Sequence, residues 1–303
     1  MDNLDPTMAQ AHVVKCRDRM LDCSPGMARG AHVMGILNVT PDSFSDGGRY
    51  LRPDAAFARA EEMFEQGATM IDVGGESSRP TGKTYGEGAR PITASEEIRR
   101  VAPIIEGIAL RLPDVFVSVD TYKPEVAAAA VDAGAHIIND ITGLRFSPEV
   151  GRVAARANAG LILMHSVGTP GALPHDVEHE DVIGTVRQSL QTSLDRAHEA
   201  GAQNIILDPG FGFGKSVADN LRLIQHLAEL EDLGRPILLG ISRKSTIASV
   251  IAREGEPPPP EQRLFGTLGA TALAVLNGAA IIRTHDIRET VEMLAVLGAI
   301  RNV

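Results

Sequence analysis

Eight short apolar segments, each followed by a stretch with helical spacing, constrain the fold of this chain more than any other feature. The apolar segments cover residues 32–39, 69–74, 115–120, 136–140, 161–165, 204–208, 236–242 and 280–285. Helical spacing of apolar residues is clearest at 55–66, 94–112, 124–133, 178–200, 220–230 and 262–277. Eight strand-then-helix units in 303 residues predict an α/β fold of the (β/α)8, or TIM, barrel type. An open doubly wound sheet is the alternative that this pattern leaves open.

The composition agrees with buried parallel strands. Hydrophobic residues make up 44% of the chain and aromatic residues only 4%, with no tryptophan, so we expect an aliphatic core. Residues 1–30 precede the first barrel strand, and we expect 13–22 to form a short hairpin over the N-terminal mouth of the barrel. Residues 31–303 are then predicted to form a single barrel domain.

Charge and apolar content exclude several classes of protein. A net charge of −10 argues against non-specific nucleic-acid binding. No apolar run reaches the roughly 20 residues of a membrane span, and the polar N-terminus lacks the apolar segment of a secretory signal. We therefore expect a cytoplasmic protein. In such a protein Cys16 and Cys23 are interpreted as reduced structural thiols, with a disulfide as the alternative.

All eight predicted strands end in polar or ionisable residues. The ends carry Asn38, Asp72, Asp120, Asn139, His165, Asp208, Ser242 with Lys244, and Arg283 with His285. Any one of them could cap the helix that follows. In a barrel, however, all eight ends lie on the face where active sites are built, so together they predict a site there.

Two chemical groups stand out among these strand ends. Asp120, Asn139 and Asp208 offer hydrogen-bond acceptors and an amide, which suit a flat heterocycle with several N–H donors. Because the net charge is negative, a phosphate would need a local cationic pocket, and four residues could form one: Arg79, Lys244, Arg283 and His285. The last two strands are the usual phosphate-binding quarter of a barrel.

The motifs at these strand ends resemble those of a known family. They are, in chain order, MGILNVTPDSFSDGG, IDVGGESSRP, SVDTY, IINDI, LMHSVGTP, ILDPGFGFGK, GISRKS and RTHD. Nearly the whole chain resembles the dihydropteroate synthase family. The resemblance implies a transferase of folate biosynthesis that condenses p-aminobenzoate with 6-hydroxymethyl-7,8-dihydropterin diphosphate to give 7,8-dihydropteroate and diphosphate. It also implies Mg²⁺, a homodimer and a target of sulfonamides.

The resemblance assigns roles to residues of this chain. The pterin would be held by Asp120, Asn139, Asp208 and Lys244. The diphosphate would be bound by Asn38, Arg283 and His285, with Asn38 also as the Mg²⁺ ligand. The p-aminobenzoate pocket would be shaped by Phe44, Ser78, Arg79, Pro80, Phe213 and Ser245. The residues implied at the reacting centre are Asp120, Lys244, Arg79 and Asp46, and the loops 40–48 and 77–91 would close over it.

Three departures from the family pattern bear on detail. Ser78 stands where the family usually has Thr, His165-Ser166 stands where His-Met is expected, and residues 81–91 form a longer loop. Two other functions stay open at this point: a pterin-dependent methyltransferase acting with a corrinoid protein, and a non-catalytic pterin-binding paralogue.

Overall fold

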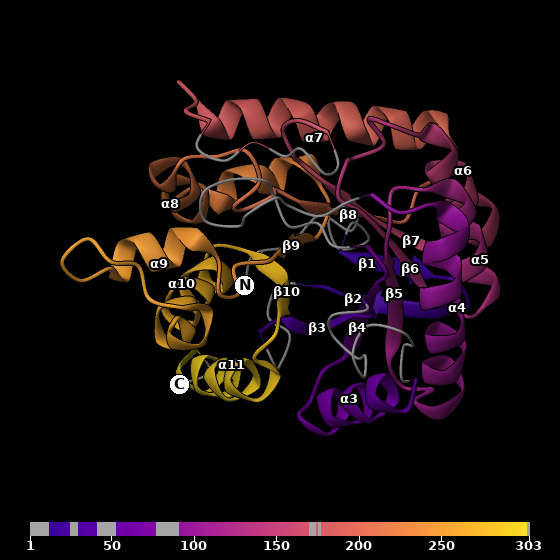
Figure 1. The fold of residues 1–303 in the computed structure, drawn as a ribbon. Helices are drawn as coiled ribbons and strands as arrows, with labels where there is room; N and C mark the ends of the chain where they lie inside the picture. Colours follow the sequence, from indigo (N-terminus) through magenta and orange to yellow (C-terminus); the bar gives the residue numbers. More distant parts are fainter. Residues whose placement is uncertain are drawn as a thin grey trace.

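A closed barrel of eight parallel strands forms the centre of the molecule (Figure 1). The computed structural model describes residues 12–24, 30–40, 53–76, 91–169, 174 and 177–301. The strands are β3 (His32–Asn38), β4 (Met70–Gly74), β5 (Phe116–Asp120), β6 (Ile137–Asp140), β7 (Gly160–Met164), β8 (Ile205–Asp208), β9 (Ile237–Leu239) and β10 (Ala279–Thr284). β10 pairs with both β9 and β3, which closes the circle. The predicted (β/α)8 barrel is thus confirmed, and the open sheet is wrong.

Helices surround the strands, and their ends follow local capping chemistry. They are α3 (Pro53–Glu65), α4 (Ala94–Arg111), α5 (Pro124–Asp132), α6 (Pro148–Ala157), α7 (Val182–Glu199), α8 (Val217–Gln225), α9 (Ser245–Ile251), α10 (Leu264–Leu276) and α11 (Ile287–Arg301). The short 3-10 helices η1 (Leu227–Leu233) and η2 (Pro260–Gln262) complete the set. α7 begins four residues later than predicted because the side chain of Asp181 accepts a hydrogen bond from the backbone N–H of Gly184 and caps the helix there. Within the described ranges, no helix is both long and apolar enough to cross a bilayer.

β9 is the one strand that is much shorter than its predicted segment. It ends at Leu239, whereas residues 236–242 were predicted. The chain turns away from the sheet here, and Arg243 adopts the left-handed conformation with φ of 57°. This backbone is uncommon for a residue with a side chain. The result is a polar loop, rather than more strand, between β9 and α9.

The N-terminal hairpin closes the bottom of the barrel, as predicted. β1 (Val13–Cys16) pairs antiparallel with β2 (Arg19–Asp22). Apolar residues of the hairpin pack against the lower interior of the barrel; this cluster contains Val14, Cys16, Leu21, Cys23, Met34, Met70, Phe116, Ile137, Ile162, Ile206, Leu238 and Ile281. Both cysteines are free and buried, and burial raises the pKa of the Cys16 thiol to about 12.

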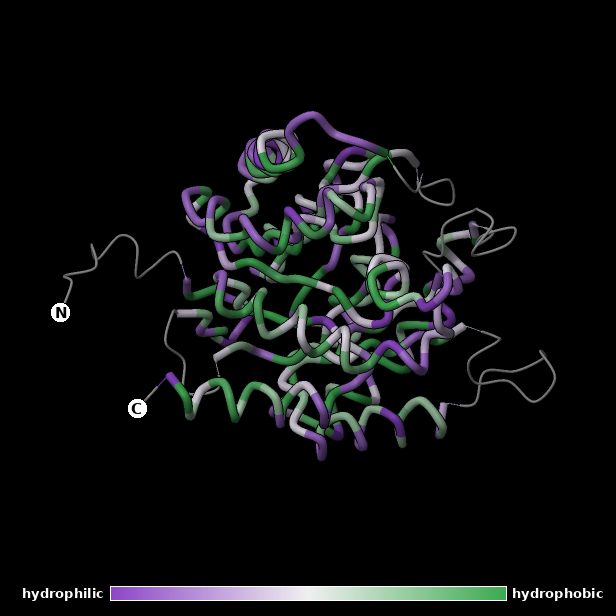
Figure 2. Tube along the Cα trace, turned by 90° about the vertical axis from the view of Figure 1, so that its left-hand side faces the viewer, coloured by the Kyte–Doolittle hydropathy of each residue, from purple (hydrophilic) through white to green (hydrophobic). Residues whose placement is uncertain are grey.

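Above this apolar cluster, the next inward-facing side chains along the strands are mostly polar. Met34, Met70 and Phe116 lie side by side, and Ile36, Asp72 and Ser118 are their counterparts two residues further along. Alternate residues of a strand face the same side, so both sets point into the barrel. The strands themselves are mostly hydrophobic, whereas polar residues are frequent along the surrounding helices (Figure 2). The upper interior is therefore the polar part of an otherwise aliphatic core.

Candidate active site

A buried network of charged groups fills the upper interior of the barrel. The Nε of Arg283 donates to Asp72 Oδ2 at 2.7 Å, and its Nη2 donates to Asp120 Oδ2 at 3.0 Å. Asn139 Nδ2 also donates to Asp72 Oδ2, at 3.0 Å, and the Ser118 hydroxyl donates to Asp72 Oδ1 at 2.6 Å. Side chains from β4, β5, β6 and β10 thus meet in one cluster.

Burial sets the electrostatics of this network. The side chain of Asp72 has no exposed surface, whereas those of Asp120 and Arg283 are 13% and 21% exposed. Burial raises the pKa of Asp120 to about 7, with Arg283 opposing the rise and Asp72 adding to it. Burial works against the charge of Arg283, but Asp72 and Asp120 outweigh it and hold its pKa above the usual value. The guanidinium is therefore a permanent cation between two carboxyl groups.

Asp208, at the end of β8, and Lys244, just before α9, are a second pair of interacting charged groups at the strand ends. Asp208 Oδ1 accepts a hydrogen bond from the backbone N–H of Gly210 at 2.7 Å, and burial raises its pKa. Burial lowers the pKa of Lys244 to about 7, although Asp208 opposes that change. Lys244 Nζ donates to the carbonyl of Phe211 and lies 4.2 Å from the ring centroid of Phe213. The predicted pocket residue Phe213 is therefore beside the predicted pterin ligand Lys244, and Ser245 begins α9 directly after that lysine.

His285 is held as a neutral ring, which corrects its assignment as a cation. Burial and the charges of Arg283 and Arg243 lower its pKa to about 4. The Ser242 hydroxyl lies 3.0 Å from His285 Nδ1 and accepts from the backbone N–H of His285 at 3.2 Å. In the neutral ring one nitrogen carries the proton and the other is an acceptor. His285 is thus a neutral ring that feels the charge of Arg283.

The loops after β9 and β10 are tied together beside this ring. Arg243 forms an ion pair with Asp286, in which Nε donates to Oδ2 at 3.1 Å. The carbonyl of Arg243 accepts from Arg263 Nη1 at 2.7 Å. These bonds hold the left-handed turn that directs the chain from Ser242 to Lys244.

Asn38 is the last residue of β3, the strand that pairs with β10. The side chain is exposed. Gly74 on β4 leaves room next to it: a Cβ there would lie 3.4 Å from Asn38 Oδ1 and 3.6 Å from Asp120 Cβ. No group of three or more His, Cys, Asp or Glu in the described part of the chain could hold a metal ion. The donor set fits Mg²⁺ bound by the one amide oxygen and by substrate oxygens, since this ion usually keeps few protein ligands.

Five predicted site residues lie outside the described residues: Phe44, Asp46, Ser78, Arg79 and Pro80. The chain on either side of 77–90 is anchored by an ion-pair network that the sequence interpretation missed. Lys123 Nζ donates to Glu76 Oε2 and to Glu97 Oε2, each at 2.6 Å. Glu76 Oε2 also accepts from the backbone N–H of Ile92 at 2.9 Å, so the described residues on both sides of 77–90 meet at one carboxylate.

Asp72 and Lys215 are the other groups that sequence reasoning left without a role. Asp72 had been noted only as part of a strand end. Lys215 was noted only as the last residue of the motif ILDPGFGFGK, yet its Nζ lies 2.8 Å from His165 Nδ1. Burial lowers the pKa of Lys215 to about 7 and that of His165 to about 3. The two-residue periodicity of β4, which places Asp72 above Met70, is the signal that could have identified the first of them.

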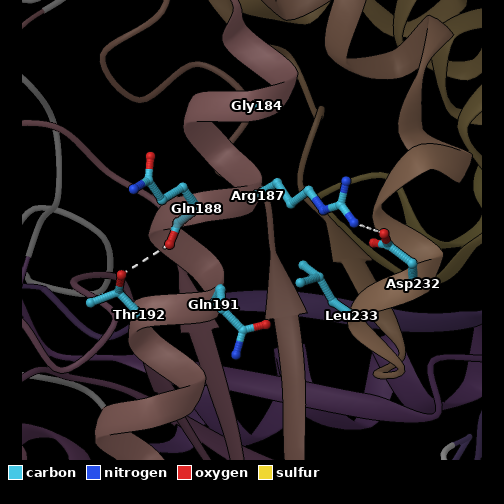
Figure 3. Close-up of a pocket in the computed structure, with 7 residues that line it drawn as sticks. All are labelled: Gly184, Arg187, Gln188, Gln191, Thr192, Asp232 and Leu233. Atoms are coloured by element: carbon cyan, nitrogen blue, oxygen red, sulfur yellow. Dashed lines mark hydrogen bonds and ion pairs between the residues drawn. The ribbon is translucent and has the colours of Figure 1, made fainter.

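A separate hollow of about 490 Å³ lies on the outside of the barrel, between α7 and η1 (Figure 3). It is lined by Gly184, Arg187, Gln188, Gln191, Thr192, Asp232 and Leu233, with Arg187 and Asp232 paired across it. None of the strand-end residues contributes to it. The chemistry predicted from the strand ends therefore belongs to the barrel mouth.

Comparison with known proteins gives a consistent result. Residues 34–285 match the family model described as pterin binding enzyme. Dihydropteroate synthase of Escherichia coli is 44% identical over 272 residues, covering 88% of this chain and 91% of that protein. Dihydropteroate synthase of Xanthomonas albilineans with 4-aminobenzoic acid superposes with a TM-score of 0.83 at 41% identity, covering 96% of this chain and 99% of that one. The same enzyme in complex with 7,8-dihydropteroate gives 0.80 at 38% identity, with the same coverage.

Proposed function

This chain belongs to the pterin-binding enzyme family and, within it, to the dihydropteroate synthases, and from that premise we propose how the side chains of its barrel mouth divide the reaction. The enzyme is a transferase of folate synthesis that joins p-aminobenzoate to the methylene carbon of a dihydropterin diphosphate and releases diphosphate. The observation that carries the assignment of roles is the single buried network in which Arg283 contacts Asp72 and Asp120. It places a fixed cation next to hydrogen-bond acceptors.

The pterin ring is proposed to occupy the space between Asp120, Asn139 and Asp208. Asn139 and Asp208 are 3% and 6% exposed, respectively. Asn139 Oδ1 and Asp208 Oδ2 accept no hydrogen bond from the described residues. A buried acceptor without a donor costs about 1–3 kcal/mol, so ring N–H groups that satisfy these oxygens bind favourably. Lys244 completes the pocket by donating to the ring.

The diphosphate is proposed to leave toward Asn38, Arg283 and His285. Arg283 supplies a permanent charge, and the neutral ring of His285 supplies a hydrogen-bond donor in the tautomer that carries its proton on Nε2. When bound, Mg²⁺ supplies charge stabilisation for the departing diphosphate, with Asn38 as its protein ligand. Asn38→Ala is expected to raise the Mg²⁺ concentration needed for half-maximal turnover; an unchanged requirement would refute this role.

Bond breaking at the pterin methylene carbon is proposed to run ahead of bond making. As the C–O bond to diphosphate breaks, positive charge develops on the carbon and the ring, and the ionised form of Asp120 favours that charge. The amine of p-aminobenzoate then forms the new C–N bond, and its surplus proton passes to the released diphosphate. The pocket for that amine is proposed to include Phe213 and Ser245 beside Lys244, together with Phe44, Ser78, Arg79 and Pro80. Arg79 and Asp46 are also proposed to act at the reacting centre.

Sulfonamides are proposed to compete for the p-aminobenzoate pocket. A dihydropteroate synthase of Yersinia pestis, 40% identical to this chain, has been solved in a sulfonamide drug complex with a TM-score of 0.83 to this structure. Inhibition of this enzyme should be competitive with p-aminobenzoate. Inhibition that is competitive with the pterin diphosphate alone would contradict the proposed pocket.

A homodimer through α10 and α11 is proposed as the working form in the cytoplasm. Exposed apolar side chains gather on these helices: Phe265, Leu273 and Leu276 on α10, and Val296 and Ile300 on α11. Such a patch is characteristic of an interface. Leu276→Glu should convert a dimer to a monomer in light scattering, whereas Leu110→Glu, on α4, should not. A wild-type monomer would refute the dimer.

Release of diphosphate on mixing the two substrates with Mg²⁺ tests the activity as a whole. Asp120→Ala and Arg283→Ala should each abolish release; normal release by either variant would contradict the assigned roles. A corrinoid-dependent methyltransferase has no use for the diphosphate-binding residues Asn38, Arg283 and His285. A non-catalytic pterin-binding paralogue would be stabilised by pterin without releasing diphosphate. The sequence identity to dihydropteroate synthases, which extends over most of their length, supports neither the methyltransferase nor the non-catalytic paralogue.

A further inference from the structure

Asp72 is assigned no contact with substrate, yet it lies below two parts of the site. We call these the pterin pole (Asp120, Asn139, Asp208 and Lys244) and the diphosphate pole (Asn38, Arg283 and His285). Its Oδ2 accepts from Asn139 Nδ2 at 3.0 Å and from Arg283 Nε at 2.7 Å, while its Oδ1 accepts from Ser118 at 2.6 Å. Asn139 belongs to the proposed pterin pole and Arg283 to the diphosphate pole. One carboxylate oxygen is therefore shared by a residue of each.

The contact with Asn139 decides which end of that amide faces the pocket. An ionised carboxylate accepts hydrogen bonds and donates none. Asn139 must therefore turn its NH₂ group toward Asp72 and its oxygen away from it. In the opposite orientation two oxygens would meet about where the NH₂ now donates, at the cost of a buried repulsion. Asp72 thereby keeps an acceptor, and not a donor, available to the ligand.

The contact with Arg283 fixes the plane of the guanidinium. Nε donates to Asp72 and Nη2 to Asp120, so two hydrogen bonds hold the guanidinium. Its Nη1 has no partner among the described residues. A guanidinium held in this way keeps a preset direction for binding an anion. Asp72 is completely buried, so water does not substitute for it.

We propose that Asp72 is a positioning residue that couples the two poles: it orients the Asn139 amide for the pterin and the Arg283 guanidinium for the diphosphate. This inference rests on the proposed function, because it takes the ligands of the two poles from there. It predicts that loss of one side chain weakens the binding of two chemically different ligands.

The two poles are measured separately on the full-length protein. Calorimetry with 6-hydroxymethyl-7,8-dihydropterin, which has no phosphate, reports the pterin pole, and inorganic diphosphate with Mg²⁺ reports the other. Asp72→Leu has similar size but no acceptor, and it should weaken both ligands by about 10- to 100-fold, the range of one lost charge-assisted hydrogen bond. The KM for p-aminobenzoate should stay within about twofold of wild type, because neither oriented residue is assigned to that pocket.

The conservative variant gives an independent test that does not depend on the folding of Asp72→Leu. In Asp72→Asn the amide oxygen can accept from Asn139 and Arg283, while the NH₂ donates to the Ser118 oxygen. All three contacts survive, so pterin affinity should stay within about threefold of wild type. A loss of tenfold or more in this variant would show that charge matters rather than positioning, and would overturn the proposal.

The matched control is Asp219→Leu, which removes a buried carboxylate whose partners are Arg222 and His179 rather than groups of the site. It should lower thermal stability and leave both affinities within about twofold. Equal losses in Asp219→Leu and Asp72→Leu, or unchanged affinities in Asp72→Leu, would overturn the coupling role. If wild type itself neither binds the pterin nor releases diphosphate, the proposed function fails instead, whatever the Asp72 variants do.

Discussion

Replacement of Arg283 by Met should destabilise the enzyme in a pH-dependent way. The substitution keeps most of the side-chain volume and removes the cation that is paired with Asp72 and Asp120, whose side chains are 0% and 13% exposed. Breaking a buried ion pair from one side typically costs about 3–5 kcal/mol. Because Arg283 is 21% exposed, we expect the low end, about 3 kcal/mol near pH 6.

The pH dependence follows from Asp120. Burial raises its pKa to about 7 in wild type against the opposing charge of Arg283, so without that charge the folded-state pKa rises further. Between about pH 7 and the new value, the folded variant holds a proton that folded wild type has lost, while the unfolded chains are ionised in both. A raised acid loses stability as pH increases, so the deficit should grow by up to about 1.4 kcal/mol per pH unit above neutrality.

The assay is thermal and urea unfolding of both proteins at about pH 6 and about pH 8.5, where linkage predicts the largest contrast. A deficit of about 3 kcal/mol corresponds to roughly 6 °C in Tm for a chain of this size, with a larger drop at the higher pH. Arg152→Met removes an exposed pair with Glu149 and should leave Tm unchanged at both pH values. A deficit that is equal at the two pH values, or larger at the lower one, would refute the reasoning.

Three further outcomes are expected from local geometry. Gly210→Ala should fail to fold normally, because φ at Gly210 is 71° and a Cβ would lie 1.8 Å from the carbonyl oxygen of His165. The control Gly234→Ala places its Cβ within 4 Å of no atom and should lower the free energy of unfolding in urea by about 1 kcal/mol. A folded, fully stable Gly210→Ala would contradict this. Lys123→Met leaves two buried carboxylates without their cation and should lower the free energy of unfolding by about 3–5 kcal/mol, and a loss below about 1 kcal/mol would show that the network is not structural. Cys16 should react with a disulfide reagent only as fast as the protein unfolds, since burial keeps it a thiol, and rapid labelling of the native enzyme would refute this.

The arrangement of the strand-end residues shows what periodicity can and cannot predict. Asp120 and Asn139 were placed on one face from strand position alone, and the register puts them opposite each other on β5 and β6. His285 was counted as a cation from its residue type. Its neutral state comes from burial beside two arginines, and neither the burial nor the arginines' distances can be read from the chain.

The boundaries differ for a similar reason. The segment 236–242 is apolar enough to continue as a strand, but Arg243 adopts a left-handed backbone that is held by Asp286 and Arg263. Those partners are 43 and 20 residues away in sequence. No local pattern announces a turn whose stabilising contacts are that distant.

The sequence by itself determined the eight strand-and-helix units, the N-terminal hairpin and the types of side chain at the strand ends. These depend on residue identity and on apolar residues that repeat every two positions in a strand or every 3.6 in a helix. Only the tertiary structure decided which groups share a bond. Closure of β10 onto β3 brings Arg283 into reach of Asp72 and Asp120, residues 211 and 163 positions away. Charge in a barrel interior depends on burial and on neighbours within a few ångströms, and it is the closed sheet that sets both.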